Sequence, residues 1–267
     1  MNQLNIEKIH CDNVPVLVVH PIRDTGNPVI LYHGWSSRSE YQITKAGILA
    51  MNGYTVYIPE AASHGERGPL SDYYRFEDYS IFWDTILHNM EEFPLLQERI
   101  GRDYKEKPFL MGHSMGGLSV LGIGAVHGDK IRGIISFNGS GDWLMTHLFL
   151  QARFGMYMER NWPLYDGIEK KSPINHLDVL KNIPIFMTNG EIDSSVDPRA
   201  QAHFAEALER AGGKGTRITY PHQGHFVTTN MMDDAMKWME GIDRRQLSAV
   251  GCRLSAGRLL NHRRRLL

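Results

Sequence analysis

Short apolar runs alternate with longer amphipathic segments along most of the chain. Short apolar runs that are bounded by Pro, Gly, Asp or Asn predict β-strands. The runs that predict strands are Val14–His20, Pro28–His33, Tyr54–Ile58, Lys107–Met111, Ile131–Phe137, Ile183–Gly190 and Thr216–Tyr220. The segments between them whose pattern favours helix are Glu40–Met51, Phe76–Ile100, Gly117–Val126 and Val227–Glu240. Strands separated by helices predict a mainly parallel sheet with helices on both faces.

Two helix signals refine this pattern. Asn52-Gly53 follows the helix predicted over Glu40–Met51 and is a typical helix stop. Pro94 falls inside the segment Phe76–Ile100 and is expected to kink or break that helix.

Residues 112–116 read Gly-His-Ser-Met-Gly, directly after a predicted strand and directly before a predicted helix. A serine hydroxyl becomes a useful nucleophile when a sharp turn presents it to a base. Glycines on both sides remove the Cβ atoms that would collide in such a turn. Ser114 is therefore the candidate nucleophile.

The chain supplies an acid and a base after Ser114, in that order. Asp193 lies in the loop after the predicted strand Ile183–Gly190, and His225 lies just after the predicted strand Thr216–Tyr220. Sites in open α/β sheets form outside the carboxyl ends of the strands, where these loops meet. We expect Asp193 to orient His225 and His225 to deprotonate Ser114.

Each partner has rivals nearby in the sequence. Asp193 competes with Glu191 and Asp197, but Asp197-Pro198 has the pattern of an N-cap followed by the first helical residue. His225 competes with His222, and the Gly224 before His225 favours His225.

Four motifs together resemble the α/β-hydrolase superfamily. They are Tyr32-His33-Gly34-Trp35, Gly-His-Ser-Met-Gly-Gly from Gly112, Gly190-x-x-Asp193-x-x-Val196 and Gly224-His225. Within the superfamily the chain is similar to small bacterial carboxylesterases of the dienelactone-hydrolase and prolyl-oligopeptidase-like branch. The resemblance implies an α/β-hydrolase fold with a small helical cap insertion. It also implies an oxyanion hole formed by the backbone N–H groups of Met115 and Trp35.

The segment 141–182 is too long for a plain connection and is rich in large apolar residues. We expect a cap whose inner face forms the substrate pocket; an inserted helical pair with an ordinary core stays open as the alternative. The predicted pocket residues are His33, Trp143, Phe149, Phe154 and Met158.

Composition narrows the function classes. The 267 residues have a net charge of −1, which gives no general attraction to nucleic acid or anionic membrane. The chain has only two cysteines, Cys11 and Cys252, and its N-terminus lacks a secretory pattern, so we expect a cytoplasmic protein. Its histidines show no metal-binding spacing such as H-E-x-x-H, and we predict neither metal nor cofactor.

We expect one domain over residues 1–242, including the insertion, followed by a basic extension over 243–267. The extension holds seven arginines and one acid, Asp243, and we expect it to be solvated or partly helical. Its pairs Leu259-Leu260 and Leu266-Leu267 could instead pack on the domain or on a second subunit, which leaves a homodimer open.

These observations predict a serine hydrolase that cleaves small carboxylic esters through an acyl-enzyme on Ser114. Esters of short-to-medium acyl groups and aryl esters, including feruloyl and cinnamoyl esters, fit a small cap. A thioesterase or a peptidase would use the same three residues, so both stay open. A non-catalytic binding protein is a weaker alternative, because Ser114, Asp193 and His225 are all present.

Overall fold

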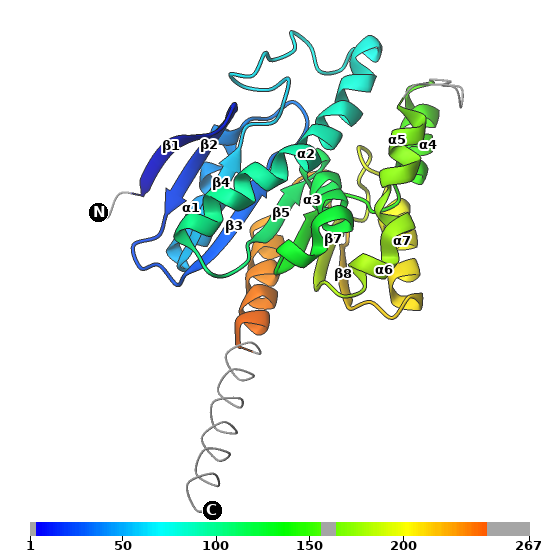
Figure 1. The fold of residues 1–267 in the computed structure, drawn as a ribbon. Coiled ribbons are helices and arrows are strands. Elements are labelled where there is room, and N and C mark those ends of the chain that lie inside the picture. The colour runs from blue at the N-terminus through cyan, green and yellow to red at the C-terminus, as the bar shows by residue number, and fades with distance from the viewer. Residues whose placement is uncertain (1–3, 156–163, 245–267) are drawn as a thin grey trace, which may run out of the picture. The chain divides into compact units, whose positions relative to one another are not determined.

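The computed structural model describes residues 4–155 and 164–244, and they form an α/β structure (Figure 1). The strands are β1 (Asn5–Cys11), β2 (Val14–His20), β3 (Asn27–Tyr32), β4 (Tyr54–Pro59), β5 (Phe109–His113), β6 (Gly133–Phe137), β7 (Ile185–Gly190) and β8 (Gly215–Tyr220). The α-helices are α1 (Ile43–Met51), α2 (Tyr79–Asp103), α3 (Met115–His127), α4 (Trp143–Phe154), α5 (Tyr165–Lys171), α6 (Leu177–Leu180) and α7 (Pro198–Arg210). Short 3₁₀ turns are η1 (Ser39–Gln42), η2 (Phe76–Asp78), η3 (Gly128–Lys130) and η4 (Pro173–His176).

The eight strands form one sheet in the order β1-β2-β4-β3-β5-β6-β7-β8. β1, β2 and β4 pair antiparallel, and all pairs from β4 through β3 to β8 are parallel. The parallel strands therefore share one carboxyl edge, where ligand sites of such sheets form. Strands β4, β6 and β7 are buried along their whole length, as expected where helices cover both faces of a sheet.

The predicted strands and helices are all present, and α7 extends the helix start predicted at Asp197-Pro198. Two further findings differ from the prediction. β1 was not predicted, because most of its residues are exposed at the sheet edge and give no apolar run. Pro94 does not break α2, which runs without interruption from Tyr79 to Asp103. The helix continues because Met90, Phe93 and Leu96, on either side of the proline, are buried in the core.

The chain divides into two compact units, Met1–Val227 and Thr228–Leu267. The first contains the whole sheet. In the second, residues 229–244 are helical, which matches the helix predicted from the sequence. The predicted domain end at Ile242 thus falls inside the second unit. The predicted basic extension lies outside the described residues except for Asp243 and Arg244.

In the part of the chain that the structure describes, no helix combines the length and the apolar character needed to cross a lipid bilayer.

Candidate active site

Ser114 occupies the sharp turn between β5 and α3. Its φ is 58°, a positive value that residues other than glycine rarely adopt. Ser114 N–H donates to the Phe137 carbonyl at 2.9 Å, which ties the turn to β6. A Cβ on Gly112 would come within 2.1 Å of the Gly116 carbonyl oxygen, and a Cβ on Gly116 within 2.3 Å of the Tyr32 carbonyl oxygen. The two glycines therefore permit the close crossing of strand and helix that presents the serine.

The Ser114 hydroxyl contacts a histidine that a carboxylate holds in place. Ser114 Oγ lies 2.7 Å from His225 Nε2, and His225 Nδ1 lies 2.7 Å from Asp193 Oδ2. The second oxygen of Asp193 accepts the backbone N–H groups of Ser195 and Val196 at 2.8 and 3.1 Å. These bonds fix the carboxylate, so the three side chains have the geometry of nucleophile, base and orienting acid.

Two loops bring the acid and the base together, one after β7 and one after β8. Ile192 N–H donates to the Gln223 carbonyl at 3.0 Å, which joins the loops. Gly190 allows them to touch, since a Cβ there would lie 2.3 Å from the Gln223 carbonyl oxygen. This close approach places Asp193 beside His225.

The rival residues have other partners. Asp197 caps α7: its carboxylate accepts Arg199 N–H at 2.9 Å and also pairs with the Arg199 guanidinium at 2.5 Å. His222 is exposed, and its backbone N–H donates to Glu191 Oε2 at 3.1 Å. The geometry therefore favours Asp193 and His225 as the partners of Ser114.

Two backbone N–H groups are available beside Ser114. Met115 begins α3, so its N–H has no acceptor within the helix. Among the described residues, Trp35 N–H has no hydrogen-bond acceptor either. The loop that holds Trp35 lies against the turn, because a Cβ on Gly34 would be only 3.3 Å from Ser114 Cβ. This arrangement suits an oxyanion hole, and the assignment of its two donors stays a prediction.

A cavity of about 710 Å³ adjoins Ser114 and His225. Its lining residues are Trp35, Ser36, Tyr73, Tyr74, Arg75, Tyr79, Phe82, Ser114, Leu150, Arg153, Gly155, Ser195, Val196 and His225. Trp35 is held firmly in this wall: its indole N–H donates to the Tyr73 carbonyl at 2.7 Å, and its ring meets those of Tyr73 and Phe82 edge-on. Most of the cavity surface is therefore aromatic or apolar.

Comparison with known families decides the class of the protein. The prolyl oligopeptidase family matches residues 102–241, which is more than half of the chain. The chain belongs to the prolyl oligopeptidase family. The serine aminopeptidase family S33 also matches, over residues 24–154. The match over 102–241 contains Ser114, Asp193 and His225, and the predicted α/β-hydrolase fold is confirmed for this family member.

Individual relatives agree with this class. Esterase YjfP of Escherichia coli (strain K12) is 29% identical over 246 residues, which cover 87% of this chain and 97% of that protein. Putative esterase YitV of Bacillus subtilis (strain 168) is 31% identical over 147 residues, which cover 53% of this chain and 56% of that protein. The crystal structure of TT1662 from Thermus thermophilus has the same fold, with a TM-score of 0.72 at 20% identity over 90% of this chain and 98% of that one.

Trp143 belongs to the core rather than to the cavity wall, which corrects the expectation from the sequence. Its side chain is fully buried, and its ring centroid lies 5.8 Å from that of Trp83. A Cβ on Gly122 of α3 would lie 2.6 Å from the Trp143 ring, so that glycine makes room for the indole. Among the described side chains of α4, those of Leu150 and Arg153, near its carboxyl end, line the cavity.

The other predicted pocket residues also lie elsewhere or outside the description. The Phe149 ring packs against Arg199, whose guanidinium carbon lies 4.4 Å from the ring centroid. His33 is buried, and its Nδ1 lies 2.9 Å from the Gly34 carbonyl oxygen. Gly34 belongs to the loop of residues 34–37 that holds Trp35, the predicted oxyanion donor, and we call this segment the oxyanion loop. Met158 and the side chain of Phe154 lie outside the described residues.

Sequence reasoning missed Tyr73, Tyr79 and Phe82, which form much of the cavity wall. Tyr73 lies in the long connection between β4 and α2, and Tyr79 and Phe82 lie at the start of α2. The segment 141–182 was predicted to form the pocket because of its length and its large apolar residues. The segment after β4 shares both features, and the same reasoning would have identified it. The Tyr79 side chain is held in place by its hydroxyl, which accepts Trp83 Nε1–H at 3.0 Å and lies 2.8 Å from His147 Nδ1.

A second histidine, His113, lies next to His225. The ring centroid of His113 lies 4.9 Å from that of His225. Burial, together with the nearby His225, lowers the pKa of His113 to about 3. His113 is therefore neutral at neutral pH and adds no fixed positive charge beside His225.

Within residues 4–155 and 164–244, no three His, Cys, Asp or Glu side chains converge as a metal site would require. The expectation that the enzyme needs neither metal nor cofactor stays a prediction.

Proposed function

We propose that this enzyme is a carboxylesterase that works through an acyl-enzyme on Ser114. The observation that carries the proposal is the continuous chain of 2.7 Å contacts from Ser114 through His225 to Asp193, placed at the wall of a large cavity. Membership of a serine hydrolase family and the similarity to esterase YjfP over 87% of the chain support it.

The mechanism follows from the contacts. His225 Nε2 takes the Ser114 proton as Oγ attacks the ester carbonyl, and Asp193 stabilises the imidazolium that forms. The negative carbonyl oxygen then accepts the N–H groups of Met115 and Trp35. His225 gives its proton to the departing alcohol. Water repeats the sequence on the acyl-enzyme, which releases the acid and restores Ser114.

The cavity supports a preference for aryl or short-to-medium acyl esters. Trp35, Tyr73, Tyr79 and Phe82 present aromatic surface beside the nucleophile. Aromatic groups gain from offset or edge-on contacts with such walls in addition to the burial of apolar area. We propose that the end of α4 forms part of the cap over this space, since Leu150 and Gly155 contribute to the lining.

Feruloyl or cinnamoyl ester hydrolysis is the alternative that the aromatic wall favours most. Thioesters and peptides would meet the same three residues.

A cytoplasmic location and a homodimer remain predictions, and the free, buried Cys11 is compatible with a reducing compartment.

A matched set of substrates tests the proposal. We expect a higher kcat/KM for p-nitrophenyl acetate, butyrate and benzoate and for methyl ferulate than for the corresponding thioesters and anilides. Ser114→Ala should abolish every activity that belongs to this site. A clear preference for an anilide or thioester would contradict the assignment, as would activity that survives in Ser114→Ala.

A further inference from the structure

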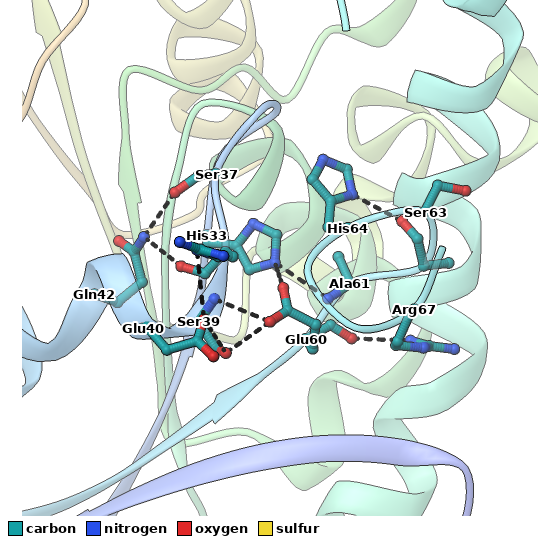
Figure 2. Close-up of polar contacts among 12 residues, drawn as sticks. His33, Ser37, Ser39, Glu40, Gln42, Glu60, Ala61, Ser63, His64 and Arg67 are labelled. Carbon is teal, nitrogen blue, oxygen red and sulfur yellow. Dashed lines mark hydrogen bonds and ion pairs between the residues drawn. The ribbon is translucent and has the colours of Figure 1, made fainter. Parts of the chain in front are cut away.

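Two ionisable side chains, His33 and Glu60, are buried in contact with each other (Figure 2). His33 is 1% exposed and Glu60 is 2% exposed, and His33 Nε2 lies 3.0 Å from Glu60 Oε1. Burial alone raises the pKa of Glu60, but the bonds from His33 and Ser39 outweigh it, and the pKa lies below its ordinary value. Glu60 is therefore a carboxylate at neutral pH. A buried carboxylate is costly to desolvate, so this pair needs a reason beyond packing.

Glu60 is held rigidly from several directions. Ser39 Oγ donates to Glu60 Oε2 at 2.7 Å, and Arg67 donates to the Glu60 carbonyl at 2.9 Å (Figure 2). Arg67 also pairs with Glu92 of α2. Gly65 has φ +48°, and a Cβ there would lie 2.3 Å from Glu60 Oε2. The surrounding loop is thus shaped around the carboxylate.

His33 is held by this carboxylate on one side and bonds the oxyanion loop on the other. Its Nδ1 lies 2.9 Å from the Gly34 carbonyl oxygen. A carbonyl oxygen can only accept, so Nδ1 carries the proton that makes this bond. Ala61 N–H also lies 3.1 Å from Nε2, but a nitrogen that donates its proton to Glu60 cannot accept this N–H as well.

The bond to the Gly34 carbonyl sets the direction of the next N–H group. The described residues contain no cis peptide bonds, so the Gly34–Trp35 peptide is trans. In a trans peptide the carbonyl and the N–H point in opposite directions. Holding the Gly34 oxygen toward His33 therefore turns Trp35 N–H away from His33.

We propose that His33, held by Glu60, is a positioning residue of the oxyanion site that orients Trp35 N–H toward the carbonyl oxygen of the bound ester. The inference rests on the proposed esterase function. A hydrogen bond to the carbonyl also polarises the peptide and strengthens its N–H as a donor. Glu60 and His33 thus orient the donor to the oxyanion, just as Asp193 and His225 orient and activate the nucleophile.

A rival explanation is that the packing of the Trp35 ring alone fixes the loop. Three substitutions at His33 separate the two. Asparagine places an amide nitrogen where Nδ1 was and can still donate to Gly34. Glutamine reaches toward Glu60 but cannot place its donor at the Nδ1 position. Alanine does neither.

The experiment measures kcat and KM for p-nitrophenyl butyrate, the inhibition constant of a trifluoromethyl ketone and the melting temperature of each variant. Loss of a whole oxyanion donor costs roughly 10²- to 10³-fold, and misdirection of one should cost about 10-fold or more. We expect His33→Ala and His33→Gln to lower kcat to this extent with little change in KM. The inhibitor, whose adduct on Ser114 carries an oxyanion, should weaken in parallel. His33→Asn should recover most of both losses.

The proposal is overturned if the asparagine variant is no better than the glutamine variant, or if all three variants keep wild-type kcat. It is also overturned if activity follows melting temperature alone, or if the loss falls on KM. Wild-type hydrolysis and its absence in Ser114→Ala are measured in the same series. If the wild type fails to cleave esters, the proposed function fails; if it cleaves them and the His33 variants do not behave as described, only the positioning role fails.

Discussion

At the scale of single residues, neighbouring side chains of one type perform different tasks. Asp193 and Asp197 lie in the same loop, yet Asp193 contacts His225 at 2.7 Å while Asp197 caps α7. The sequence predicted this division, because Asp-Pro is a typical start of a helix. A residue that satisfies the local backbone is not free to orient a distant imidazole.

Substitution of the two aspartates should separate these tasks. Asp193→Asn should lower kcat by on the order of 10⁴-fold with the fold intact, because the amide favours the wrong tautomer of His225. Asp197→Asn should keep nearly full activity, since asparagine also caps helices well. Ester hydrolysis and thermal unfolding of both variants check this, and comparable activity of the two would show that Asp193 is not the acid.

Two aromatic residues allow a similar comparison, because Phe82 lies in the cavity wall and Trp143 lies in the core. Phe82→Ala should lower kcat/KM for benzoate esters much more than for acetate, because only the larger group contacts the Phe82 wall. Trp143→Ala should instead lower the free energy of unfolding by about 3–5 kcal/mol, as deletion of a fully buried aromatic ring does. Substrate profiles and urea denaturation distinguish these outcomes. An altered ester preference in the Trp143 variant, with unchanged stability, would place that residue at the pocket after all.

Site residues could be predicted from the sequence where a local backbone pattern sets their position. They could not be predicted where the packing of helices sets it. Ser114, Asp193 and His225 each follow a strand end, so a strand pattern is enough to predict where they meet. Trp143 and Tyr79 both begin helices and are both large and apolar. The angle at which each helix packs decides which ring faces the cavity, and no local pattern in the sequence records that angle.

At the scale of elements, close contact between β3, β5 and α3 creates the site. Gly116 makes this contact possible, since a Cβ there would lie 2.3 Å from the Tyr32 carbonyl oxygen. The motif around Ser114 therefore predicts the turn, while the approach of β3 to it appears only in the folded structure. The long helix α2 shows the opposite case: Pro94 suggested an interruption, and core packing overrode it.

Two glycine substitutions test the role of this crossing. Gly116→Ala should lower the free energy of unfolding by about 1–3 kcal/mol, because backbone atoms must shift to admit the methyl group, and it should lower kcat as the oxyanion loop moves. Gly101→Ala is the control: no atom lies within 4 Å of the added Cβ, and alanine in a helix should raise stability by up to about 1 kcal/mol without affecting activity. Equal effects of the two substitutions would mean that the crossing tolerates a side chain.

At the scale of the whole molecule, buried histidines make stability depend on pH. Burial lowers the pKa of His64 to about 4, of His113 to about 3 and of His147 to about 4. The ordinary histidine pKa in the unfolded chain is 6.5. As pH falls below that value, the unfolded state binds protons that the folded state does not. These groups therefore favour folding fully above pH 6.5, and this contribution declines as pH falls toward 4.

We expect the free energy of unfolding to fall between pH 6.5 and 5 by up to about 1.4 kcal/mol per pH unit for each of these histidines. Urea denaturation at several pH values measures the slope. His64→Gln removes one of the three sites and should reduce the slope by about a third. A free energy of unfolding that stays constant across this range would show that the three rings titrate normally in the folded protein.

The central claim is that Ser114 forms the acyl-enzyme, and mass spectrometry of the trapped intermediate tests it most directly. Rapid mixing with p-nitrophenyl butyrate followed by acid quench should increase the protein mass by one butyryl group. Peptide mapping should locate that group on the peptide that contains Ser114. The adduct should be absent in Ser114→Ala and should accumulate much more slowly in His225→Ala, while His222→Ala should behave like the wild type. An adduct on another residue, or continued ester hydrolysis by Ser114→Ala, would contradict the account.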